Sequence, residues 1–81
     1  RSKFKEIERE EISLEEKMAE VREQVRGLEG INFRTLLEMQ ASKMNVIVTF
    51  LAILELMKIG AITIKQEDIF GDIVIDSLDT I

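Results

Sequence analysis

The fold is decided by the stretch MNVIVTFLAILELMKIGAITIKQEDIFGDIVI, residues 44–75. Its first sixteen residues are polar at only four positions, whereas a helix on a protein surface normally shows one apolar stripe of about 100°. After Gly60 the period changes, because isoleucines recur at every second position in residues 62–64 and again in residues 73–75. This pattern predicts a long apolar helix followed by a two-stranded hairpin.

The predicted long helix carries apolar side chains on two opposite faces. At 100° per residue, one arc holds Val46, Phe50, Ile53, Leu54 and Met57, and the opposite arc, around Glu55, holds Met44, Val48 and Leu51. We expect the core to be built from Phe50, Leu54, Met57, Ile62, Ile64 and Ile73. The opposite arc then needs cover from the chain itself or from another protein, since large exposed apolar patches usually mark interaction sites. The run is too short to span a membrane.

Upstream, Ser13 followed by Glu16 is a capping-box signature and predicts that a helix begins there. One apolar stripe, Leu14, Met18, Val21, Val25 and Leu28, keeps helical spacing, and we assign it to the core. Gly27 or Gly30 ends this helix. A short strand is predicted over residues 31–33 and a second short helix over residues 34–40.

The order of elements is therefore helix, short strand, helix, helix, strand, turn, strand. This order predicts an α+β winged helix-turn-helix, with three helices and a small antiparallel β-hairpin as the wing. Residues 13–81 form this domain, and residues 1–12 form a charged arm or linker. The chain begins at Arg1 without an initiator Met, so we expect it to be a C-terminal fragment of a longer protein.

The composition argues against catalysis and metal binding by this domain. There is no Cys and no His, so the commonest general base and the commonest zinc ligands are missing. The acids Glu67, Asp68, Asp72, Asp76 and Asp79 match no EF-hand spacing, and acids on an edge strand usually prevent aggregation. We expect no metal, no cofactor and no enzymatic activity.

Charge also argues against nucleic acid as the partner. The net charge is −5, and the long helix offers Lys43 and Lys58 only at its ends. The wing is acidic, where a DNA-binding wing would carry Arg or Lys. Phe70 in this acidic turn either folds back onto the core, which is the simpler interpretation, or anchors a partner. The wing also leaves a strand edge that can pair with another protein.

In register, residues 46–75 resemble the C-terminal winged-helix domain of kleisins, in particular the prokaryotic segregation and condensation (ScpA) family. The resemblance runs through the apolar helix, Gly60, Gln66 and the turn FGDI at residues 70–73. It extends upstream through ISLEEKM and INFRTLLE, and so covers the chain from about Ile12 onward.

The resemblance implies a non-enzymatic subunit of a condensin-like complex, cytoplasmic and associated with the nucleoid. Its C-terminal domain would dock on the ATPase head of an SMC protein and help to close a ring around DNA. The domain itself would neither contact DNA directly nor bind a membrane. We predict that the head contacts Phe70, Val74, Met44, Val48 and Leu51, with the wing ranked above the helix. A DNA-binding regulator and a homodimerisation module are the alternatives.

Overall fold

The computed structural model describes residues 11–66 and 69–79. Its elements are α1 (Leu14–Val25), β1 (Ile31–Asn32), α2 (Phe33–Glu38), α3 (Lys43–Lys58), β2 (Ile62–Gln66) and β3 (Ile73–Ser77). This is the predicted α+β arrangement, and it is consistent with a winged helix. Most of the predicted arm, residues 1–10, lies outside the described residues, as do residues 67–68 of the predicted turn.

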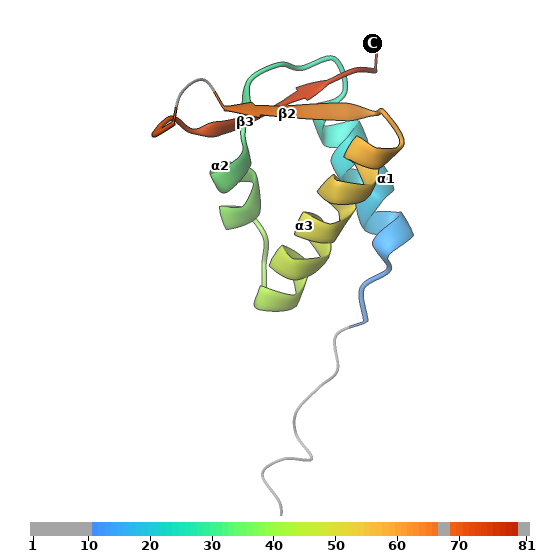
Figure 1. Cartoon of the computed structure of the whole chain (residues 1–81). Helices are drawn as coiled ribbons and strands as arrows, with labels where there is room; N and C mark the ends of the chain where they lie inside the picture. Colours follow the sequence, from blue (N-terminus) through green and yellow to red (C-terminus); the bar gives the residue numbers. More distant parts are fainter. Residues whose placement is uncertain (1–10, 67–68, 80–81) are drawn as a thin grey trace, which may run out of the picture.

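The three strands form one antiparallel sheet in the order β1-β3-β2. Ile64 of β2 pairs with Ile75 of β3, and Asn32 of β1 pairs with Val74. The sheet lies across one end of the helices, with α3 between α1 and α2 (Figure 1). The hairpin formed by β2 and β3 is the predicted wing, and the predicted short strand adds to its other side.

A side chain caps the N-terminus of each of the three helices, and of these caps only the one at Ser13 was predicted from the sequence. Ser13 Oγ accepts a hydrogen bond from the Glu16 N–H at 3.1 Å, which confirms the predicted start of α1. Asn32 caps α2 in the same way, and Ser42 caps α3. Each cap satisfies one of the N–H groups that have no partner within the helix, typically worth about 1 kcal/mol.

Gly60 ends α3 in a Schellman motif. The Ala61 N–H donates to the Leu56 carbonyl at 2.9 Å, and the Gly60 N–H donates to the Met57 carbonyl at 3.1 Å. Gly60 has a φ of 82°, a left-handed conformation that glycine adopts without a steric penalty. The chain can therefore turn at once from α3 into β2.

The core lies where α1 and α3 meet the inner face of the sheet. Its buried members are Val21, Val25, Leu36, Ile53, Leu56, Ala61, Ile62 and Ile75, and Met18, Ile31, Phe33, Leu37 and Ile64 pack against them. The predicted burial of Ile62 is confirmed, and Ile64 packs against the core as a half-buried residue. Leu28, beyond the end of α1, is half exposed instead of buried.

The predicted orientation of the long helix is wrong. Its buried residues are Val48, Thr49, Ala52, Ile53 and Leu56. Of the arc assigned to the core, only Ile53 is fully buried, while Phe50, Leu54 and Met57 are exposed. The predicted core residue Ile73 is also exposed, at 38%. The physical reason is that a helix apolar on nearly all sides contains no polar face to mark the side that meets solvent.

Polar contacts tie the C-terminal end of the sheet to the rest of the domain. Arg22 of α1 binds Asp79 through two hydrogen bonds, Nε to Oδ2 at 2.8 Å and Nη2 to Oδ1 at 3.0 Å. Asp76 accepts a hydrogen bond from the Gly30 N–H at 2.7 Å and forms an ion pair with Lys65. These contacts hold the loop before β1, and α1 itself, against β3.

The Arg22–Asp79 contact predicts acid sensitivity. Hydrogen bonds from Arg22, and then its positive charge, hold the pKa of the Asp79 carboxyl below its usual value. The folded state therefore binds this proton more weakly than the unfolded state, whose Asp pKa is about 3.9. The stabilisation is complete above that value and is lost as the pH falls through the lower, folded-state pKa.

We expect Asp79→Asn to lower the urea midpoint at pH 7 and to reduce the further loss of stability between pH 7 and pH 3. Glu29→Gln is the control, because Glu29 is an exposed carboxylate in the loop after α1. If the native chain and Asp79→Asn lost equal stability between the two pH values, this ion pair would not be a source of the acid sensitivity.

Candidate functional site

The most prominent surface feature is the side of α3 that faces away from the core. We call it the α3 outer face, and it consists of Met44, Ile47, Phe50, Leu51, Leu54 and Met57. Each of these side chains is 39–47% exposed. At 100° per residue they fall on one continuous arc of the helix. The charged residues beside it are half-buried Glu55, which adjoins Met44 and Leu51 on the helix, and exposed Lys43 and Lys58 at the helix ends.

The size of the α3 outer face indicates an interaction site. Six side chains of about 150–200 Å² each, exposed to this degree, present roughly 400–500 Å² of mainly apolar surface. The largest apolar patch on a typical monomer covers about 300–600 Å² and is often functional. A stable protein interface buries about 800 Å² on each partner. The α3 outer face would therefore supply about half of one, and a second surface is needed to complete it.

The tip of the wing is the best candidate for that second surface. Ile69 is 82% exposed and Phe70 is 96% exposed, so the interpretation in which Phe70 folds back onto the core is wrong. Gln66 shapes the turn: its Nε2 donates to the Ile69 carbonyl at 3.1 Å and to the Gly71 carbonyl at 2.9 Å. The tip thus presents two large apolar side chains on a turn braced by hydrogen bonds.

The structure does not gather the five predicted contact residues on one surface. Met44 and Leu51 lie on the α3 outer face, as predicted, and Phe70 lies at the wing tip. Val48 is buried, at 9% exposure, so it cannot be a direct contact of a partner in this fold. Val74 is half buried in the central strand, and because side chains alternate across a strand, it lies on the opposite sheet face from buried Ile75.

Sequence reasoning missed several residues of the α3 outer face. Phe50, Leu54 and Met57 were assigned to the core, and Ile47 to neither arc, although all four are exposed. One available signal was the pair of small residues Thr49 and Ala52 in the middle of the helix, since small side chains favour close packing against another element. These two residues mark the buried face.

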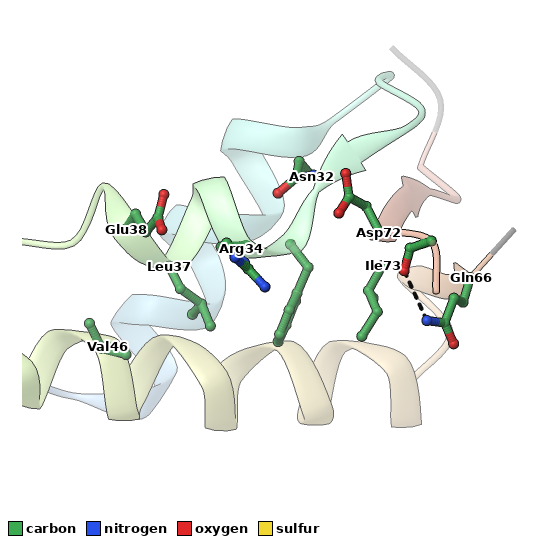
Figure 2. A pocket seen from close by; sticks show the side chains of 10 residues that line it. Asn32, Arg34, Leu37, Glu38, Val46, Gln66, Asp72 and Ile73 are labelled. Atoms are coloured by element: carbon green, nitrogen blue, oxygen red, sulfur yellow. Dashed lines mark hydrogen bonds between the residues drawn. The ribbon is translucent and has the colours of Figure 1, made fainter. Parts of the chain in front are cut away.

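A groove adjoins the α3 outer face where α2, α3 and the wing meet (Figure 2). Its volume is about 570 Å³, and its lining includes Phe33 and Leu37 from α2, Val46 from α3 and Ile73 from β3. The Phe33 ring packs edge to face against Phe50, with ring centroids 6.0 Å apart. The groove and the α3 outer face therefore share a boundary at this aromatic pair.

Within residues 11–66 and 69–79, no group of three or more Asp or Glu side chains is placed to hold a metal ion. Asp76 and Asp79 of the acidic C-terminal segment are instead engaged by Lys65 and Arg22. In the same described part of the chain, no helix combines the length and the apolar character needed to cross a membrane.

Comparison with known proteins identifies the family of this chain. The family model for segregation and condensation protein ScpA matches residues 1–78. The chain belongs to the ScpA family. Segregation and condensation protein A from Halothermothrix orenii is 44% identical over 72 residues, covering 86% of this chain and 30% of the relative. The protein of the same name from Brevibacillus brevis is 41% identical over 69 residues, covering 85% and 27%.

A third ScpA relative, from Bacillus pumilus, is 43% identical over 76 residues and covers 93% of this chain. Each of these three matches spans only 27–30% of the relative's length. The chain is thus similar to one part of a longer segregation and condensation protein.

Proposed function

We propose that this domain is a non-enzymatic docking module of a chromosome segregation and condensation complex, and that it binds the ATPase head of an SMC protein. The observation that carries the proposal is the α3 outer face, an apolar surface on a domain of the ScpA family. The relatives are named for segregation and condensation, and the family model is named for SMC together with ScpA. ATP hydrolysis would belong to the partner, and the domain would act at the nucleoid through the complex.

We propose the α3 outer face and the wing tip as the two halves of the docking surface. Met44 and Leu51 remain in the proposed contact set, together with Phe70 at the tip. We keep Val74 as a secondary contact, because it lies on the half-buried outer side of the wing. In a longer kleisin, this attachment would form one of two links that close a ring around DNA.

The geometry supports protein docking better than DNA binding. In a winged helix that reads DNA, the third helix presents polar and basic side chains to the bases and phosphates. Here the exposed side of α3 is apolar, and the exposed residue Asp72 adds negative charge at the wing. An apolar exposed helix is also compatible with pairing between two copies of the chain, which the binding experiment below separates from docking.

Phe70→Ala is expected to weaken binding to the SMC head of the same organism by about tenfold or more. A large aromatic side chain that becomes buried at an interface is a typical hot spot. Titration calorimetry with the native chain and the variant measures the effect, and circular dichroism checks the fold. Since Phe70 is 96% exposed in the domain, its removal should leave stability almost unchanged.

The native chain should bind the head in a one-to-one ratio, and the affinity should survive moderate salt, because the surface is mainly apolar. An affinity for DNA that collapsed as salt increased would instead favour the DNA-binding alternative. Absence of head binding, together with a concentration-dependent mass in sedimentation, would refute docking and favour the homodimer.

A further inference from the structure

We propose that the groove between α2, α3 and the wing binds one specific element of the partner: an apolar side chain that is followed or preceded by a lysine or arginine. This inference rests on the proposed docking function, which it extends by stating the chemistry of one contact. The groove lies outside the predicted contact set, since none of Phe70, Val74, Met44, Val48 and Leu51 lines it.

The floor of the groove is apolar and therefore favours an apolar side chain of the partner. Leu37 and Ile73 point toward α3 from α2 and from the wing, and Val46 lies on α3 at the Leu37 side of the groove (Figure 2). Leu37 and Phe33 pack against the hydrophobic core, so the floor belongs to the folded body of the domain. A volume of about 570 Å³ is within the range of ligand sites and can hold one or two large side chains.

The rim of the groove carries a net negative charge and therefore favours a basic side chain of the partner. Glu38 and Asp72 lie toward opposite ends of the groove, and Arg34 lies between them (Figure 2). All three side chains are exposed, and none of them forms an ion pair with another residue in the described part of the chain. Two carboxylates against one guanidinium leave the rim negative, which favours a cationic group beside the apolar anchor.

The wall formed by the wing is already in place. The Gln66 amide, which donates to both the Ile69 and the Gly71 carbonyls, fixes the turn that carries Asp72. A preformed wall reduces the ordering cost that a binding partner must offset. At the other side, the Phe33–Phe50 contact joins the groove to the α3 outer face, so one partner can occupy both.

A second copy of this chain fits the groove poorly. Its own exposed anchor, Phe70, is flanked in sequence by Asp68 and Asp72. Insertion of that tip would bring carboxylates to a rim that already carries Glu38 and another Asp72, and like charges brought together oppose binding. The charge of the rim therefore favours a basic partner over self-association.

The test is charge reversal at the rim. The double variant Glu38→Lys/Asp72→Lys should bind the intact SMC protein of the same organism about five- to tenfold more weakly at low salt, chiefly through slower association. The difference should shrink as salt increases, because exposed charges are screened. The matched control is Glu15→Lys/Glu29→Lys, which changes net charge equally at two exposed positions outside the groove. Val46→Asn tests the floor and should also weaken binding several-fold.

Surface plasmon resonance at low and moderate salt gives the rates, and circular dichroism verifies each fold. Weaker binding by the rim variant but not by the control supports the inference. Equal binding by the rim variant and the native chain would overturn it while leaving docking intact, and so would an equal loss in the control. Absence of binding by the native chain would overturn the docking proposal itself, and this inference with it.

Discussion

Ile53→Ala is expected to lower the free energy of unfolding by about 2–5 kcal/mol, whereas Leu54→Ala should lower it by about 1 kcal/mol or less. The two residues are neighbours on α3, but Ile53 is fully buried in the core and Leu54 is 45% exposed on the α3 outer face. Truncating Ile53 leaves a cavity among core side chains. Truncating Leu54 mainly removes surface that already contacts water.

Urea denaturation followed by circular dichroism measures both values under one set of conditions. The comparison is well controlled, because each variant replaces a residue by alanine in the middle of the same helix and helix propensity changes little. A domain of this size has little stability in reserve, so Ile53→Ala can be largely unfolded without denaturant. A larger loss for Leu54→Ala than for Ile53→Ala would contradict the orientation of α3 described above.

The order of elements could be predicted because local signals mark several of the boundaries, although the second helix begins at Phe33 and ends at Glu38 instead of spanning residues 34–40. Ser13 caps α1 where the sequence places a capping box, and Gly60 ends α3 where the apolar run stops. The period-two isoleucines predicted both strands of the wing. These features depend on residues close in sequence, so no knowledge of tertiary contacts is needed to recognise them.

The orientation of α3 could not be predicted in the same way. Because α3 is apolar on nearly every side, its sequence is compatible with several rotations about the helix axis. The face that is buried is therefore determined by the neighbouring elements. Here α1 and the sheet cover the face that contains Ala52 and Ile53. Phe50 and Leu54 are left outside because no described element covers that side fully.

The wing shows the same limit. Alternation correctly indicates that Ile73 and Ile75 share a face of the sheet, but it cannot say how far the helices extend beneath that face. Ile75 lies over the core and is fully buried, while Ile73, two residue pairs closer to the tip, remains 38% exposed beside the groove. The candidate site therefore consists of apolar residues that the sequence pattern assigns to the core but that the other elements of the fold leave exposed.

The largest effect on binding is expected at the centre of the α3 outer face. Leu54→Asp should weaken binding to the SMC head at least 100-fold, because a charge in the centre of an apolar interface must lose its water without gaining a partner. Leu28→Asp is the matched control, since Leu28 is a leucine of similar exposure, 49%, that lies in the loop after α1. Titration calorimetry measures both affinities, and urea denaturation confirms that both variants fold. If Leu54→Asp bound the head as tightly as Leu28→Asp, the α3 outer face would not be the docking surface.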